Sequence, residues 1–156
     1  MTEHEQRIRE LTRDYSVTIA TDVRWGDMDA FNHVNNVSYL RYFESGRIAY
    51  FEALDLADFF GVRGVGPILA DTSCRYKLPL TYPDRISVGV RSENLGEDRF
   101  TQQYIIVSHR HGRVAATGDG TIVTFDYTQS RKCPIPDRVR RRIEALENGA
   151  GAGNRV

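Results

Sequence analysis

Apolar and polar positions along the chain change period several times, and each change marks a predicted element. Apolar residues alternate with polar ones from Tyr15 to Trp25, which predicts a first β-strand. From Val37 to Leu54 they recur every three to four positions, which predicts a helix of about 20 residues. Strand-like segments follow at about 68–78, 86–95, 100–109 and 113–127.

Short polar turns separate the later strands, at 79–84, 96–98 and 111–112. Such short connections predict antiparallel neighbours. One long helix with a set of antiparallel strands is an α+β arrangement, in which we expect the helix to cover one face of a curled sheet of about five strands. Glycine is unfavourable inside a helix, so Gly46 is expected to mark a close approach of the helix to the sheet.

The two ends of the chain have patterns of their own. Ile8 and Leu11 are the spaced apolar pair of a predicted N-terminal helix. A second helix is predicted at 137–147, behind a proline-rich start, and 61–67 is predicted to be a loop. The Gly- and Ala-rich end is expected to be disordered. We therefore divide the chain into an N-terminal arm (1–14), a main domain (15–130), a C-terminal extension (131–147) and a tail (148–156).

Composition narrows the possible classes of protein. A chain of 156 residues predicts one domain, and its 21 basic and 21 acidic residues argue against a nucleic-acid binder. No run of apolar residues is long enough to predict a membrane span, and the charged N-terminus does not resemble a secretory signal. Cys74 and Cys133 have no paired spacing, which favours reduced thiols in the cytoplasm.

The loop between the first strand and the long helix carries the densest candidate chemistry. Residues 26–36 contain two aspartates, one histidine and three asparagines. A loop that leads into a helix N-terminus can present backbone N–H groups to an oxyanion while a side chain attacks beside it. Asn35 or Asn36 is the expected N-cap of that helix.

This loop and a later segment resemble hotdog-fold acyl thioesterases of the 4-hydroxybenzoyl-CoA type, which are related to acyl-carrier-protein thioesterases. The later segment is Tyr76–Asp84, and the resemblance spans about 15–130. It implies a helix wrapped by the sheet, and hydrolysis of a thioester to a carboxylic acid and a thiol without metal or cofactor. The residues that match the D-x-D-x-x-x-H-V-N-N-x-x-Y signature and its surroundings are Trp25, Asp27, Asp29, His33, Val34, Asn35, Asn36, Tyr39 and Glu44.

The resemblance places the catalytic carboxylate at Asp29, the second aspartate of the signature. A carboxylate can attack the thioester carbonyl, giving an acyl anhydride, or it can deprotonate a water molecule. The backbone N–H of Asn36 is expected to polarise the carbonyl, because the helix dipole favours negative charge there. The alternative is that Asp27 and Asp29 are turn residues bound to local N–H groups.

Three further side chains are expected to support the reaction. His33 would orient water or Asp29, and Asn35 would hold Asp29 by a hydrogen bond. Glu44, two turns into the helix, would support the residues that contact the substrate. Each has a structural alternative: a histidine bonded to the loop backbone, a helix cap, and a surface ion pair of Glu44 with Arg41 or Arg47.

Five residues are candidates for binding the substrate. Arg75 and Lys77 share one strand face, and Arg131 and Lys132 follow the last strand. Basic side chains suit the phosphates of CoA or of phosphopantetheine. Tyr39 is the fifth candidate, from the signature itself. Because exposed basic residues are common, a solvated surface is the alternative for each of them.

The predicted substrate is an acyl-CoA, with two alternatives open. An acyl-carrier-protein substrate is favoured by the HVNN string and opposed by Phe31, which replaces an asparagine of that branch. A hotdog module that binds acyl-CoA without hydrolysis is opposed by Asp29. The resemblance also implies a homodimer or homotetramer with the acyl pocket between subunits, completed by the partner's residues near 72–77, and unpaired edge strands are a physical reason to associate.

Overall fold

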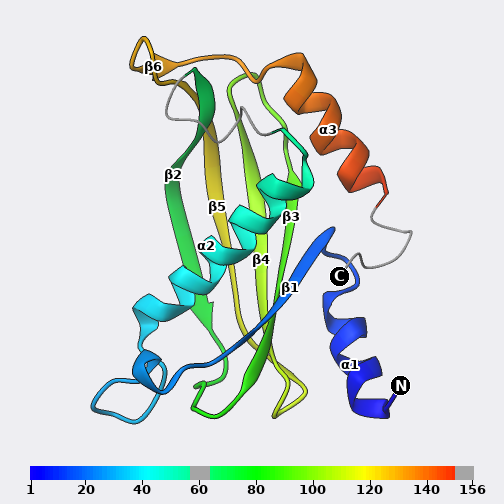
Figure 1. The fold of residues 1–156 in the computed structure, drawn as a ribbon, viewed down its shortest axis with the longest axis vertical. Helices are drawn as coiled ribbons and strands as arrows, with labels where there is room; N and C mark the ends of the chain where they lie inside the picture. The colour runs from blue at the N-terminus through cyan, green and yellow to red at the C-terminus, as the bar shows by residue number, and fades with distance from the viewer. Residues whose placement is uncertain (57–63, 150–156) are drawn as a thin grey trace.

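The computed structural model describes residues 1–56 and 64–149, and its centre is a helix lying across an antiparallel sheet (Figure 1). The helices are α1 (Glu3–Thr12), α2 (Asn36–Ala53) and α3 (Asp137–Asn148), with a short 3-10 helix, η1 (Trp25–Asp27), before α2. The strands are β1 (Val17–Asp22), β2 (Val65–Tyr76), β3 (Arg85–Glu93), β4 (Arg99–Ser108), β5 (Arg113–Asp126) and β6 (Arg131–Lys132).

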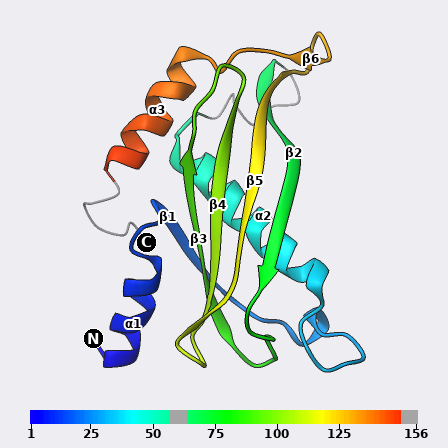
Figure 2. The same cartoon turned by 180° about the vertical axis from the view of Figure 1, so that it is seen from behind.

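The sheet has the strand order β1-β3-β4-β5-β2, with β6 paired to β5, and every pairing is antiparallel. The strands curve around α2, which crosses one face of the sheet (Figures 1 and 2). This is the α+β hotdog arrangement that the sequence predicts. β1 and β2 are the two edges of the sheet, so each has one side without a neighbouring strand among residues 1–56 and 64–149.

Close contact between α2 and the sheet explains the glycine in the helix. A Cβ atom at Gly46 would lie 2.8 Å from Val90 Cγ2 and 2.9 Å from Val88 Cγ1. Opposite the helix, Gly118 of β5 makes room for the Phe43 ring, since a Cβ there would lie 2.5 Å from Phe43 Cε2. Gly46 therefore has the role that the sequence predicts for it.

Several boundaries differ from the predicted ones. β1 ends at Asp22, and Trp25 belongs to η1. The prediction of a loop at 61–67 was wrong for its second part, because β2 begins at Val65. Pro67 is tolerated there because β2 is an edge strand, where a missing N–H need not break a hydrogen bond. Residues 57–63 and 150–156, which hold the first part of that loop and most of the predicted tail, lie outside the described residues.

The two terminal helices cover other parts of the sheet. Ile8 of α1 packs with Ile105 and Val107 in a cluster separate from the one beneath α2. Val139 and Ile143 of α3 join the main core. None of the described helices is both long and apolar enough to cross a membrane.

Candidate active site

Asp29 lies in the loop between β1 and α2, where backbone hydrogen bonds fix its position. Its N–H donates to the carbonyl of His33 at 3.0 Å, and its Oδ1 accepts from the N–H of Phe31 at 2.9 Å. Next to it, Met28 and Val34 form an antiparallel bridge that closes the loop. The carboxylate is half-buried, and its second oxygen accepts no hydrogen bond from a described residue. Asp29 thus forms the turn and retains a free carboxylate oxygen.

Asp27 has a different set of partners, which tie the loop to the helix. Its Oδ2 accepts from the Tyr42 hydroxyl at 2.7 Å and from the N–H of Arg24 at 3.0 Å. Its carbonyl accepts from the N–H of Asn35 at 2.8 Å. Burial, reinforced by the neighbouring Asp27 carboxylate, raises the pKa of Tyr42, so the hydroxyl stays protonated as a donor. This carboxylate anchors the loop to α2.

The start of α2 leaves one backbone donor free. Asn35 is the N-cap, and its Oδ1 accepts from the N–H of Val37 at 2.9 Å. The N–H of Ser38 donates to the carbonyl of Asn35, whereas the N–H of Asn36 has no acceptor among the described residues. A free N–H at the positive end of a helix dipole is suited to an oxyanion. The Asn35 side-chain oxygen is engaged by the cap, and no hydrogen bond joins Asn35 to Asp29, contrary to the sequence expectation.

Tyr76 connects the helix start to the edge strand β2. Its hydroxyl donates to the carbonyl of Asn36 at 3.2 Å, and its ring packs edge-on against Tyr39 with centroids 5.0 Å apart. Burial raises the pKa of the neighbouring Cys74, so this thiol is protonated near neutral pH. The sequence analysis placed Tyr76 at the start of the second segment that resembles the family, but gave it no partner.

His33 and Glu44 are exposed and have no side-chain partner in the described part of the chain. His33 holds the loop through its backbone carbonyl, and its ring makes no hydrogen bond there. The ion pair of Glu44 with Arg41 or Arg47, which was the structural alternative, does not form among the described residues. Both side chains are therefore available to a bound molecule.

Tyr39 lies beneath the site instead of lining it. The residue is 3% exposed, and its hydroxyl donates to the carbonyl of Leu78 at 3.1 Å and accepts from the N–H of Leu80 at 3.0 Å. The sequence placed Tyr39 against the substrate, but burial and these two bonds give it a supporting role. It holds the chain that leaves β2 against the first turns of α2.

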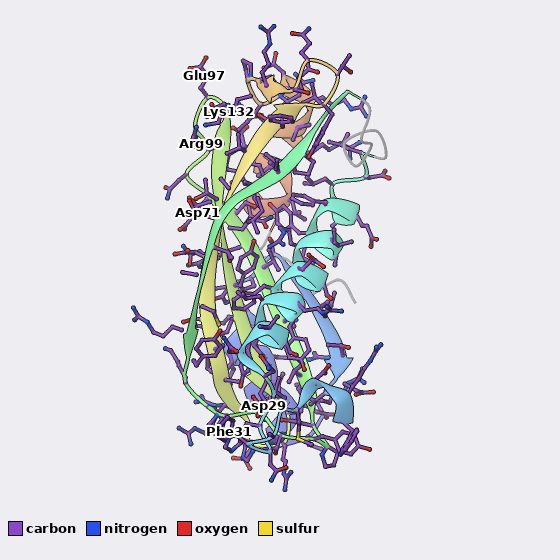
Figure 3. All side chains as sticks on the ribbon, turned by 90° about the vertical axis from the view of Figure 1, so that its left-hand side faces the viewer. Asp29, Phe31, Asp71, Glu97, Arg99 and Lys132 are labelled. Carbon is purple, nitrogen blue, oxygen red and sulfur yellow. The ribbon has the colours of Figure 1, made fainter. Side chains whose placement is uncertain are left out.

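The predicted basic residues do not gather around Asp29 within one chain. Cys74 packs against the core under α2, so the alternation of β2 directs Arg75 to the opposite sheet face. Lys77 lies just beyond the end of β2. Arg131 and Lys132 form β6, and Lys132 and Asp29 lie at opposite ends of the molecule (Figure 3).

The described residues contain no group of three or more His, Cys, Asp or Glu side chains arranged to hold a metal ion. Asp29 has one carboxylate oxygen without a hydrogen-bond partner among the described residues, and the N–H of Asn36 at the start of α2 also has no acceptor there. Such a pair can attack, or activate water against, a carbonyl group and stabilise the resulting oxyanion.

Comparison with known proteins gives consistent results. Residues 23–143 match the family model described as the Thioesterase-like superfamily. A 1,4-dihydroxy-2-naphthoyl-CoA hydrolase from Synechococcus elongatus is 30% identical over 122 residues, covering 76% of this chain and 88% of that protein. The long-chain acyl-CoA thioesterase FadM from Escherichia coli is 21% identical over 124 residues, covering 80% and 94%.

The fold is similar to that of a Thermus thermophilus thioesterase solved in complex with coenzyme A and Zn. The TM-score is 0.76 with 30% sequence identity, covering 86% of this chain and 96% of that one. A 1,4-dihydroxy-2-naphthoyl-CoA thioesterase from Synechocystis has a TM-score of 0.75 at 19% identity, covering 84% and 97%.

Proposed function

Because this chain belongs to the Thioesterase-like superfamily and is a thioester hydrolase, we propose that its substrate is an acyl-CoA and that Asp29 supplies the reacting carboxylate. The proposal rests on two groups of one loop that lack a hydrogen-bond partner among the described residues. Asp29 has a free carboxylate oxygen, and seven residues later the N–H of Asn36 has no acceptor among the described residues.

In this mechanism the N–H of Asn36 donates to the thioester oxygen while a carboxylate oxygen of Asp29 attacks the carbonyl carbon. The C–S bond breaks, and CoA leaves as a thiolate that is protonated by water. Water then hydrolyses the acyl–Asp29 anhydride, which releases the carboxylic acid and restores the carboxylate. The second route, in which Asp29 deprotonates the attacking water, is less favoured because carboxylates are in general weak bases at neutral pH.

The basic residues that lie far from Asp29 in one chain can serve the site of a second copy. β2, a strand of 12 residues, has no neighbour on its outer side among the described strands, and two such edges can pair antiparallel across a two-fold axis. That pairing would bring β6 of one subunit toward the Asp29 loop of the other, because β6 lies at the end where β2 begins. We therefore propose a homo-oligomer in which Arg131 and Lys132 bind CoA phosphates across the interface.

Two free cysteines, Cys74 and Cys133, are consistent with the reducing cytoplasm that we propose as the compartment. Their thiols also react with the reagents that detect CoA release. Assays of thiol release must therefore subtract the signal of the protein alone.

The experiment is thiol release from a panel of acyl-CoA esters by the wild type, Asp29→Asn and Asp14→Asn. Asp14 is an exposed aspartate near the N-terminal helix and serves as the matched control. We expect Asp29→Asn to lower kcat by about 100-fold or more, since one reacting group is lost. The Asp14→Asn variant should match the wild type, and both variants should keep the wild-type melting temperature.

Two results would contradict the proposal. Equal turnover by Asp29→Asn and the wild type would remove Asp29 from the reaction. A folded wild type that releases no thiol from any CoA ester would point instead to a carrier-protein substrate or to a module that binds without hydrolysis. In single turnover in labelled water, label entering Asp29 supports the anhydride route, because water that adds to the Asp29 carbonyl of the anhydride leaves its oxygen there.

A further inference from the structure

One side of α2 carries a row of residues that starts at the proposed oxyanion site. Residues spaced three to four apart lie on the same side of a helix. The Asn36 end of the row contacts Tyr76 of β2, and at the far end Arg47 Nη1 donates to the Tyr104 hydroxyl of β4 at 3.1 Å. The members of this row are Asn36, Leu40, Glu44, Arg47 and Phe51.

β2 meets this row at the Asn36 end, and α2 then crosses the sheet toward β4 (Figure 1). Tyr76 lies at the Asn36 end, whereas Leu69 lies near Tyr104: a Cβ atom at Gly120 would be 3.1 Å from Leu69 Cδ1 and 3.0 Å from the Tyr104 hydroxyl. Half-buried apolar residues, Leu40 and Cys74, pack against the core between these ends. An acyl group held at Asn36 and running along the row would pass Leu40 first, then the exposed Glu44, and reach Arg47 last.

The polar groups at the far end are a buried chain of hydrogen bonds that ends in a cation. Tyr104 and Gln102 are almost fully buried, and the Tyr104 hydroxyl donates to Gln102 Oε1 at 3.0 Å. Gln102 in turn donates to the Ser92 hydroxyl at 3.4 Å. Arg47 is half-buried, with its guanidinium carbon 5.9 Å from the centre of the Tyr104 ring.

No carboxylate lies at ion-pair distance from the Arg47 guanidinium in the described part of the chain. Arg47 forms no ion pair there, and the hydroxyl of Tyr104 is its one hydrogen-bond partner. A partly buried cation without an anion is unfavourable, and a guanidinium binds a carboxylate through two parallel hydrogen bonds. Nearby Leu69 and Ile48 remain 38% and 42% exposed, so this end of the row is reachable from outside the core.

We propose that Arg47 and Tyr104 form the far end of the acyl site and select acyl groups that end in a carboxylate. The inference rests on the proposed function, because Asn36 fixes the thioester end. Arg47 follows Asn36 by 11 residues, or about 16 Å of helix, and its side chain leans back toward the helix start. Acyl groups of about six to twelve carbons fit this separation.

The test compares CoA esters of matched chain length that end in a carboxylate or in a methyl group. The enzymes are the wild type, Arg47→Met, Tyr104→Phe and the control Arg41→Met, which removes an exposed arginine from the same helix. We expect the wild type to favour the carboxylate ester at least tenfold in kcat/KM. In Arg47→Met, kcat/KM should fall by that factor for the carboxylate ester and stay unchanged for the methyl ester. Tyr104→Phe should show part of this fall, and Arg41→Met should show none.

Binding of free α,ω-dicarboxylates, measured by calorimetry on Asp29→Asn with and without Arg47→Met, separates this inference from the proposed function. Binding that depends on Arg47 supports the inference, even if no CoA ester is hydrolysed. Turnover without a carboxylate preference, and without such binding, overturns the inference and leaves the hydrolase intact. An equal loss on both esters in Arg47→Met, or a change in its oligomeric state, overturns it as well, because Arg47 would then hold the fold or the subunits together.

Discussion

Two aspartates separated by one residue have different surroundings in this protein. The Asp27 carboxylate accepts two hydrogen bonds on Oδ2, one from a side chain of α2 and one from the backbone, whereas the Asp29 carboxylate accepts one hydrogen bond, from the backbone. Stability is expected to depend on the first residue and turnover on the second. The two contributions can therefore be separated by substitution.

Asp27→Ala removes the acceptor of the buried Tyr42 hydroxyl and of the Arg24 N–H. We expect the free energy of unfolding to fall by about 1–3 kcal/mol, the cost of leaving a buried donor unpaired. Urea denaturation measures this loss. Adding Tyr42→Phe to Asp27→Ala should recover part of it, because the unpaired hydroxyl is then gone. An unchanged urea midpoint for Asp27→Ala would show that its bonds contribute nothing net.

The candidate catalytic residues that the sequence identified lie in one contiguous segment, 29–44, because a short motif carries its own chemistry. Their partners could not be predicted, since Tyr76 reaches Asn36 across 40 positions and Tyr39 bonds to the strand exit at Leu78. Such pairs depend on how a helix lies against a sheet. Periodicity gives each element a face, but not the neighbour that the face meets.

At the scale of elements, the position of α2 depends on the missing side chain at Gly46. Gly46→Ala would gain up to about 1 kcal/mol of helix propensity. It would also place a Cβ atom 2.8 Å from Val90 Cγ2 and 2.9 Å from Val88 Cγ1. Overpacking costs about 1–3 kcal/mol, so we expect net destabilisation in urea. Ser45→Ala, at an exposed position of the same helix, is the control, and a more stable Gly46→Ala would contradict the argument.

The elements themselves were largely predictable, because their hydrophobic periods are long and regular. The α2 helix and four of the strands fall within a few residues of their predicted bounds. The sequence missed the two-residue β6, which is too short to show a period, and the face of Arg75, which depends on the register of β2 with β5. The Gly and Pro residues of 61–67 predicted a loop, but part of this segment belongs to β2, and an edge strand tolerates both residue types.

At the scale of the whole molecule, the residues of the proposed site lie at two opposite ends of the folded subunit. Asp29 lies at one end and Lys132 at the other (Figure 3), so one chain cannot place both around one substrate. The free edge of β2 offers an antiparallel pairing that would bring the two ends of different copies together. This arrangement makes a prediction about mixtures of inactive subunits.

Asp29→Asn lacks the reacting carboxylate, and Arg131→Glu/Lys132→Glu lacks the proposed phosphate contacts, so each variant alone should hydrolyse acyl-CoA poorly. In a mixed dimer, one site combines an intact Asp29 from one subunit with intact Arg131 and Lys132 from the other. Unfolding and refolding an equal mixture should therefore restore about one quarter of wild-type activity, because half of the dimers are mixed and each has one intact site. If the basic residues served the Asp29 of their own chain, every site with an intact Asp29 would lack them, and mixing would restore nothing.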